Sequence, residues 1–223
     1  MRVSLTRSTF WKISALVLAG WVVGACSHAP SLSQGDHYAM FNAKPPKGST
    51  VYVCHAYGCR RLTKVKFGKA EVSKIRKLMA KTKRKDTPEE ERRAVAYAVA
   101  WMERHVGNIT GTSADRAGMD FVASGDPTQQ DCVDEATNTT SYLMVLKNND
   151  LLKYHDVSVP FAKENYLRGV AGWTHWTAVL KDRQSKKSWA VDSWIFKNGV
   201  NPAVVETEKW YIAGLDNLPG SKR

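Results

Sequence analysis

The sequence predicts one globular domain that contains both helices and β-strands, preceded by an export signal. Three observations lead to this prediction. The 223 residues include 43% hydrophobic and 24% charged residues, which is the composition of a globular chain. Stretches with helical spacing of apolar residues are flanked by short runs that alternate apolar and polar residues, as strands do. The one long apolar run lies at the N-terminus, which excludes a polytopic membrane protein.

The first 25 residues are typical of a signal peptide (residues 1–25). Three basic residues and no acid precede an apolar stretch that is too short to span a bilayer comfortably. The end of this stretch, Val23-Gly-Ala-Cys26, resembles the lipobox of bacterial lipoproteins. The resemblance implies cleavage before Cys26 and lipidation of that cysteine, and Ser27 resembles the pattern for outer-membrane sorting. An ordinary signal peptide with a chance cysteine and an uncleaved anchor are the alternatives.

Residues 26–49 are expected to form a flexible tether, because they contain Ser, Gly, Asn and two adjacent Pro residues without periodicity. We expect a single domain at residues 50–215 and a polar tail at residues 216–223. Cleavage of the signal would remove three positive charges and lower the formal charge of the chain from +12 to +9.

Two short strands open the predicted domain, at residues 51–54 and 62–67. Cys54 and Cys59 flank the loop between them, and two cysteines this close in an oxidising envelope indicate a local disulfide. A metal site of Cys54, His55 and Cys59 is the alternative, but it lacks a fourth ligand. Free thiols are a third interpretation.

Two helices are predicted next. The first spans residues 70–82 and has apolar residues on one face. The second has clearer end signals: Thr87 can cap it, Pro88 suits the first helical position, and three Glu residues follow at the positive end of the dipole. We expect this helix to run to about residue 106 and to end at Gly107.

Most of the positive charge lies in the basic helical part of the domain, residues 60–106. Residues 60–86 alone carry 12 Lys or Arg and two acids. Nucleic acid is the usual partner of such a stretch, but export argues against it. The expected partner is an anionic envelope surface, such as lipid headgroups or lipopolysaccharide, or an acidic protein substrate. The alternative is a solvated helix face that only keeps the protein soluble.

A third predicted helix begins at Cys132 after a loop with Gly and Pro. Small or apolar residues recur from there at helical spacing, at Cys132, Ala136, Thr139, Leu143 and Leu146. Free N–H groups and the positive dipole end at a helix start favour a thiolate, the nucleophilic form of cysteine. The carboxylates of Asp131, Asp134 and Glu135 oppose this by raising the thiol pKa, unless counter-charges or a cation such as Ca²⁺ balance them.

Two aromatic-rich strands at residues 172–180 and 188–196 are joined by a polar turn and predict a β-hairpin. With the turn centred between them, His175 lies directly opposite Asp192 on one face of the sheet, about 5 Å away. Asp192 would then accept a hydrogen bond from Nδ1 of His175 and leave Nε2 as a base for Cys132.

The order of these residues resembles a known family. It resembles the core of the bacterial transglutaminase-like cysteine proteinases of the papain-like superfamily. The residues that carry the resemblance are Cys132 in Asp131-Cys-Val-Asp-Glu-Ala136, His175 in His-Trp-Thr-Ala-Val and Asp192 in Ala-Val-Asp-Ser-Trp. The resemblance covers about residues 120–200, the expected catalytic part. It implies an α+β fold with the catalytic helix packed on an antiparallel sheet. It also implies Cys132 as nucleophile, His175 as general base and acid, and Asp192 as the residue that orients His175.

The resemblance implies further roles beside the cysteine. Periplasmic, adhesin-cleaving members of the family bind Ca²⁺ through acidic residues there, which makes Asp131, Asp134 and Glu135 calcium candidates. Papain-like enzymes use an upstream Gln to donate to the oxyanion, and Gln130 is the candidate here. No other cofactor is expected.

Two further features belong to the candidate site. His155 is a second candidate base, ranked behind His175 because it lies at a helix-to-strand junction. Four Trp residues crowd the hairpin and could wall a substrate cleft, although about half of them are expected in the core: Trp173, Trp176, Trp189 and Trp194.

The resulting hypothesis is an envelope-anchored cysteine hydrolase or acyltransferase that acts on peptide or amide bonds through a thioester. It would be held by its lipid at the bacterial outer membrane, facing the periplasm, with a protein or peptide-containing envelope substrate. The alternative is a catalytically inactive binding or assembly lipoprotein on the same fold. A lone cysteine in a helix is more often a buried small hydrophobe, so the hypothesis depends on the combination of Cys132, His175 and Asp192.

Overall fold

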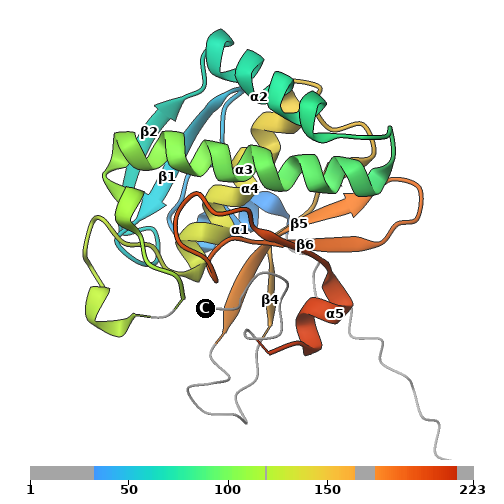
Figure 1. The fold of residues 1–223 in the computed structure, drawn as a ribbon. Coiled ribbons are helices and arrows are strands. Elements are labelled where there is room, and N and C mark those ends of the chain that lie inside the picture. Colours follow the sequence, from blue (N-terminus) through green and yellow to red (C-terminus); the bar gives the residue numbers. More distant parts are fainter. Residues whose placement is uncertain (1–32, 119, 164–173, 215–223) are drawn as a thin grey trace, which may run out of the picture. The chain divides into compact units, whose positions relative to one another are not determined.

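Two β-sheets organise the computed structural model, which describes residues 33–118, 120–163 and 174–214. The smaller sheet is an antiparallel pair of β1 (Thr50–His55) and β2 (Arg61–Lys66). The larger sheet is also antiparallel, with strand order β3-β5-β6-β7 and with β4 paired to β5. Helices cover both sheets (Figure 1), so the fold is a mixture of helices and antiparallel sheets, as the sequence predicts.

The larger sheet is built around β5 (His175–Asp182). One edge of β5 pairs with β3 (His155–Val157), and β4 (Phe161–Lys163) continues along that edge with the register shifted by one residue. The other edge pairs with β6 (Ser188–Asp192), which in turn pairs with β7 (Ala203–Glu206). The predicted hairpin is therefore the centre of the sheet.

Helix α4 (Cys132–Asn148) lies between the two sheets, and 13 of its 17 residues are buried. It contacts β1 of the smaller sheet and β5 of the larger one, and α3 crosses in front of it in Figure 1. The second half of α4 lies in the main hydrophobic core, to which it contributes Tyr142, Leu143 and Leu146. The first half buries polar side chains, which need hydrogen-bond partners inside the protein.

Helices α2 (Lys69–Thr82) and α3 (Pro88–Thr110) follow the first hairpin, close to their predicted positions. Thr87 caps α3 and Pro88 is its first residue, as predicted. The predicted end at Gly107 is wrong, because α3 continues to Thr110 and ends at Gly111, which has a φ of +86°. Gly107 serves close packing instead, since a Cβ there would lie 3.1 Å from backbone atoms of Ser113.

Three short elements complete the fold. The 3₁₀ turns Thr112–Ala114 and Phe121–Ala123 lie in the connection between α3 and α4. Helix α5 (Thr207–Ile212) follows β7 and packs against β6 and β7.

The predicted tether at residues 26–49 is wrong for its second part, because residues 34–40 form helix α1 (Gln34–Met40) and pack on the domain. Ser33 and Asp36 form a capping box at its start. Tyr38 is buried, and its hydroxyl lies 2.8 Å from Ser141 Oγ of α4. The adjacent prolines led to the prediction of a tether, and a helix of only two turns with one buried aromatic face is too short to give a clear periodic pattern.

Several predictions fall outside the described residues. The signal peptide, the lipidation of Cys26, Trp173 and the polar tail at residues 216–223 all lie there. Among the residues that are described, we find no helix with the length and apolarity needed to cross a membrane.

We predict that Tyr38→Ala lowers the free energy of unfolding by about 3–5 kcal/mol, because it removes a buried aromatic side chain from the interface between α1 and α4. Met40→Ala on the same helix is the matched control. Met40 is 52% exposed, so its loss should change stability by less than about 0.5 kcal/mol. Urea unfolding followed by Trp fluorescence measures both values, and equal effects of the two substitutions would contradict the docking of α1.

Candidate active site

Cys132 is the first residue of α4, where the sequence predicts it, and it lies in the wall of a pocket. The pocket has a volume of about 390 Å³, and the cysteine is 7% exposed. Its Sγ donates to the carbonyl oxygen of Thr174 at 3.6 Å. Thr174 directly precedes His175, so the sulfur lies at the start of β5. The pocket is lined by Tyr57, Gly58, Arg60, Ser124, Asp131, Cys132, Val133, Thr174, Trp176 and Trp194.

The thiol of Cys132 is strongly held in its protonated form. Burial raises its pKa to about 12, and the negative charges of Asp131, Asp192 and Asp134 add to this effect. The N–H of Trp176 acts in the opposite direction by bonding to the sulfur. Burial therefore dominates the thiol pKa in this resting arrangement, and the carboxylates act in the same direction.

His175 and Asp192 form a buried pair, with His175 Nε2 at 2.7 Å from Asp192 Oδ2. The predicted register of the hairpin is wrong by two residues, since β5 and β6 pair Ala178 with Val191 and Leu180 with Trp189. A shift of two residues preserves the face on which a side chain points. His175 and Asp192 are therefore diagonal neighbours on one face rather than directly opposite residues.

The hydrogen bond also reverses the predicted roles of the two ring nitrogens of His175. Nε2 faces Asp192, whereas Nδ1 is buried and has no hydrogen-bond partner among the residues that the structure describes. When Nε2 donates to Asp192, a neutral ring carries its lone pair on Nδ1. Nδ1 is thus the nitrogen that could accept a proton.

Trp210 of α5 is a member of this site that sequence reasoning missed. Its Nε1 donates to Asp192 Oδ2 at 2.8 Å, the same oxygen that bonds to His175. Its ring lies 5.4 Å from the ring of His175, and Trp194 lies on that histidine at 4.6 Å. A single Trp in a short C-terminal helix gives no sequence signal for this role, because the contact depends on the fold.

The Trp residues of the hairpin divide as expected between pocket and core. Trp176 and Trp194 line the pocket beside Cys132. Trp189 lies away from it and stacks on the guanidinium of Arg92, 3.6 Å from the ring centre.

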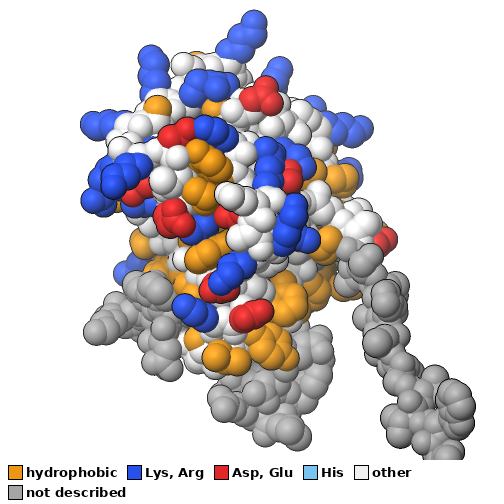
Figure 2. Space-filling view, turned by 90° about the vertical axis from the view of Figure 1, so that its right-hand side faces the viewer, with side chains coloured by type: hydrophobic (Ala, Val, Ile, Leu, Met, Phe, Trp, Pro, Cys, Tyr) orange, Lys and Arg blue, Asp and Glu red, His pale blue; other side chains and the backbone are white. Residues whose placement is uncertain are grey.

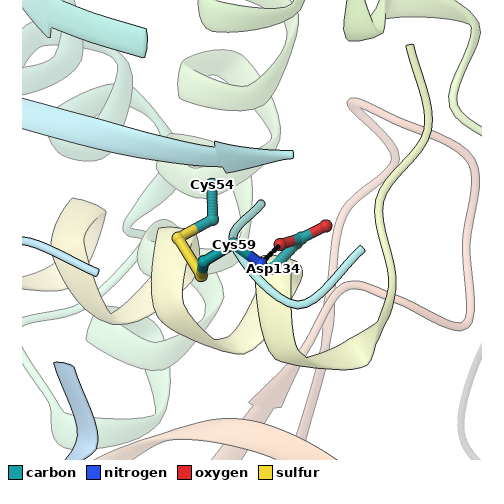
Figure 3. A group of neighbouring side chains, drawn as sticks. All are labelled: Cys54, Cys59 and Asp134. Carbon is teal, nitrogen blue, oxygen red and sulfur yellow. Dashed lines mark hydrogen bonds between the residues drawn. A yellow bond between two sulfur atoms is a disulfide. The ribbon is translucent and has the colours of Figure 1, made fainter. Parts of the chain in front are cut away.

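A disulfide joins Cys54 to Cys59, as predicted. The loop that it closes is left-handed, with positive φ at four successive residues, Ala56 to Cys59. Figure 3 shows the disulfide beside Asp134, whose carboxylate accepts hydrogen bonds from the N–H groups of Cys59 at 2.6 Å and Tyr57 at 2.8 Å. The loop and the start of α4 are therefore fixed to each other, and Tyr57 forms part of the pocket wall.

The alternative metal site of Cys54, His55 and Cys59 is wrong. Both sulfurs are bonded to each other and cannot act as thiolate ligands, which also excludes a site made of the two cysteines and Asp134. The ring of His55 is used elsewhere, with Nδ1 at 2.8 Å from the carbonyl of Pro127 and Nε2 at 2.9 Å from the Thr63 hydroxyl.

The structure does not bring Asp131, Asp134 and Glu135 together as a calcium site. Asp131 and Asp134 cap the start of α4, each accepting from the main-chain N–H of the other. Glu135 points inward and accepts from the hydroxyl of Ser193 at 2.8 Å. The oxygen atoms of the three residues do not all lie within 4.8 Å of one another. Hydrogen bonding within the protein therefore replaces the predicted cation.

Gln130 and His155 do not take the roles expected of them. The Gln130 amide donates to the carbonyl of Cys54 at 2.9 Å and does not line the pocket, so the predicted oxyanion role is wrong. His155 is fully buried at the other end of β5, where its Nδ1 lies 2.9 Å from Glu91 and its Nε2 lies 3.1 Å from Arg92. This ionic cluster supports the junction of α3 and β3 and excludes His155 as the base.

A group of buried acids beneath the site was also missed. Burial raises the pKa of Asp115 to about 8 and of Glu135 to about 7, and the pKa of Glu103 lies well above its usual range for the same reason. Asp115 accepts from the N–H of Gln130 at 2.6 Å, and Glu103 accepts from the N–H of Gly199 at 3.0 Å. Acids on a helix or in a loop read as exposed in a sequence, so no signal pointed to their burial.

Comparison with known proteins finds no match, whether to a protein-family model, to a curated protein or to a solved structure. The interpretation of the site therefore rests on its geometry.

We predict that the free energy of unfolding decreases as the pH rises from about 6.5 to 8. The pKa values of Glu135 and Asp115, about 7 and about 8 when folded, lie near 4 when unfolded. The folded state therefore binds more protons in this range and loses up to about 1.4 kcal/mol per pH unit for each group. His37 changes the free energy of unfolding in the opposite direction, because burial lowers its pKa from 6.5 to about 4. This change takes place below about pH 6.5, so it does not alter the slope between pH 6.5 and 8.

Urea unfolding at intervals across this pH range measures the decrease. Glu135→Gln keeps an acceptor for Ser193 and should flatten the curve. Glu208→Gln removes an exposed acid and should leave the curve unchanged. A free energy that stays constant or rises with pH would contradict the protonation of these buried acids.

Proposed function

We propose that this protein is a cysteine hydrolase or acyltransferase that acts on peptide or amide bonds. The observation that carries the proposal is that Cys132, in the pocket wall, contacts the main chain that flanks a buried His–Asp pair. Cys132 touches the main chain on both sides of His175, and His175 is held by Asp192 in a buried hydrogen bond of 2.7 Å. These residue types, in this chain order, are what nucleophilic catalysis by cysteine needs.

In the proposed reaction, Cys132 transfers its thiol proton to Nδ1 of His175 and attacks the carbonyl carbon of the substrate. The tetrahedral intermediate collapses to a thioester, and the departing amine takes the proton from His175. Water, or an acceptor amine, then attacks the thioester while His175 removes its proton. That proton returns to the sulfur as Cys132 leaves. Asp192 stabilises the imidazolium that forms twice in this cycle.

The start of α4 would stabilise the developing oxyanion. Its first main-chain N–H group, that of Cys132, has no carbonyl partner within the helix. Cys132 lines the pocket, so this donor lies near the site of attack, whereas the N–H of Val133 bonds to the carboxylate of Asp131. This arrangement replaces the role first expected for Gln130.

The proposal includes a papain-like, transglutaminase-like core, within the mixed helix and antiparallel sheet fold. A central helix that begins with the cysteine and packs on the strands that carry His175 and Asp192 supports it. It also includes an envelope location, with a lipid at Cys26 at the outer membrane, on the evidence of the N-terminal sequence. A protein or peptide-containing envelope component is the proposed substrate.

The second candidate function is a catalytically inactive binding lipoprotein on the same fold. The observation that favours it is the high pKa of the Cys132 thiol, about 12, since a thiol that stays protonated is a poor nucleophile. The enzyme hypothesis requires His175 to accept the thiol proton when an electrophile, either the substrate or a reagent, enters the pocket.

We predict that iodoacetamide labels Cys132 of the native chain at pH 7 at least about tenfold faster than it labels glutathione, because His175 assists its ionisation. His175→Ala should slow the labelling at least about tenfold, and Asp192→Asn should slow it to a similar degree. Mass spectrometry of the peptide that contains Cys132 measures the rates.

Labelling slower than that of glutathione, with no change in His175→Ala, would sink the enzyme hypothesis and support the binding lipoprotein. His155→Ala is the matched control, since His155 lies at the other end of β5. The substrate class is then identified by comparing the envelope proteins released from cells with the native chain and with Cys132→Ala.

We predict that Trp210→Phe slows the same labelling about tenfold. The substitution keeps an aromatic ring beside His175 but removes the Nε1 donor to Asp192, and a hydrogen bond to a charged group contributes about 1.5–3 kcal/mol. Trp189→Phe is the control, because Trp189 Nε1 is buried without a hydrogen-bond partner. Equal labelling rates in Trp210→Phe and Trp189→Phe would contradict a role for the Trp210 hydrogen bond in the reactivity of Cys132.

A further inference from the structure

A second cleft lies at the opposite end of the smaller sheet from the disulfide loop, where β1 starts, β2 ends and α2 begins. Its volume is about 560 Å³, larger than that of the pocket beside Cys132. The end of α4 closes one side of it through Asn149. It is lined by Lys47, Ser49, Thr50, Lys66, Phe67, Gly68, Lys69, Val72, Ser73, Arg76 and Asn149.

The lining carries four positive charges and no carboxylate. The charges belong to Lys47, Lys66, Lys69 and Arg76, and none of the four makes a salt bridge within the described part of the chain. Arg76 is held in place by a hydrogen bond of 2.9 Å to the carbonyl of Asn149. Four unpaired cations around one cleft repel one another, so an anion bound there would lower their energy.

The walls also supply neutral hydrogen-bonding groups. Hydroxyls of Ser49, Thr50 and Ser73 line the cleft between the cations. The Asn149 amide donates to the Ser49 hydroxyl at 2.9 Å and so fixes one of them. A phosphate group, with several acceptor oxygens, matches such a mixture of cationic and hydroxyl donors. One opposing charge lies close by, because a Cβ built on the lining residue Gly68 would lie 2.9 Å from the carboxylate of Glu71.

The cleft continues into a wider basic surface. None of the 12 Lys and Arg residues at positions 60–86 makes a salt bridge in the described structure, although acids are available on neighbouring elements. Figure 2 shows Lys and Arg side chains projecting around the upper end of the molecule, where α2 lies in Figure 1. A free phosphate ion would occupy only the cleft. An array of phosphates would neutralise the surface as well, which points to a lipid bilayer.

We propose that this cleft binds the phosphate of an anionic phospholipid headgroup, and that the basic surface of α2 rests on the neighbouring headgroups. The inference does not depend on the chemistry of Cys132. It narrows the partners expected for the basic stretch to a phosphate-bearing lipid surface.

The test uses the full chain in neutral detergent micelles, so that its own lipid is already embedded. Thermal unfolding is followed while phosphatidylglycerol, phosphatidylcholine or inorganic phosphate is added at constant ionic strength. Phosphatidylglycerol should raise the Tm in a saturable manner, because a ligand that binds only the folded state stabilises it. The triple variant Lys47→Ala, Lys66→Ala, Lys69→Ala should raise the apparent Kd at least tenfold.

The control triple variant is Lys77→Ala, Lys81→Ala, Lys85→Ala, which removes the same charge from exposed positions outside the cleft. It should change the apparent Kd less than threefold. If the two variants weaken phosphatidylglycerol binding equally, the attraction is diffuse and electrostatic, and the proposal that the cleft is the binding site is wrong. An equal rise in Tm with phosphatidylcholine would overturn anion binding. An equal rise in Tm with inorganic phosphate would show that the cleft binds free phosphate and would contradict the proposal that it binds a lipid headgroup.

Discussion

Asn138 of α4 hydrogen-bonds both main-chain groups of Cys54: its Oδ1 accepts from the N–H at 2.7 Å, and its Nδ2 donates to the carbonyl at 2.8 Å. The side-chain amide thereby takes the place of a neighbouring strand along β1. The same face of α4 holds the disulfide loop through Asp134. Because an unpaired buried polar group costs about 1–3 kcal/mol, each of these bonds fixes the helix against the hairpin. The position of Cys132 is set by this polar attachment as well as by the apolar core.

The same polarity also affects the chemistry of the site. Burial is the main cause of the high thiol pKa of Cys132, and the carboxylates that anchor the start of α4 add to it. Burial acts on Glu135 of the same helix in the same way, because it raises the pKa of this acid to about 7 and so favours its neutral form. The proposed acceptor of the thiol proton is His175, whose flanking main chain contacts the sulfur and whose ring is held by Asp192.

Sequence reasoning succeeded where the signals are local. Helix caps and apolar spacing predicted α2, α3 and the start of α4 at Cys132, and cysteine spacing predicted the disulfide. The pairing of His175 with Asp192 was predicted from a register that is wrong by two residues, and it survives because side chains in a strand alternate with period two. Trp210 and the buried acids could not be predicted, because only the tertiary fold brings them to the site.

The packing of α1 on the domain limits the distance between the folded domain and a lipid on Cys26. With the whole segment 26–49 extended, the domain could move about 85 Å from a lipid on Cys26. Since Ser33 already caps α1, six residues separate Cys26 from Ser33, and the maximum reach of these seven Cα–Cα steps is about 25 Å. If Cys26 carries the proposed lipid, the domain would stay within a thin layer above the bilayer, and the proposed enzyme could reach only segments that lie close to the membrane surface.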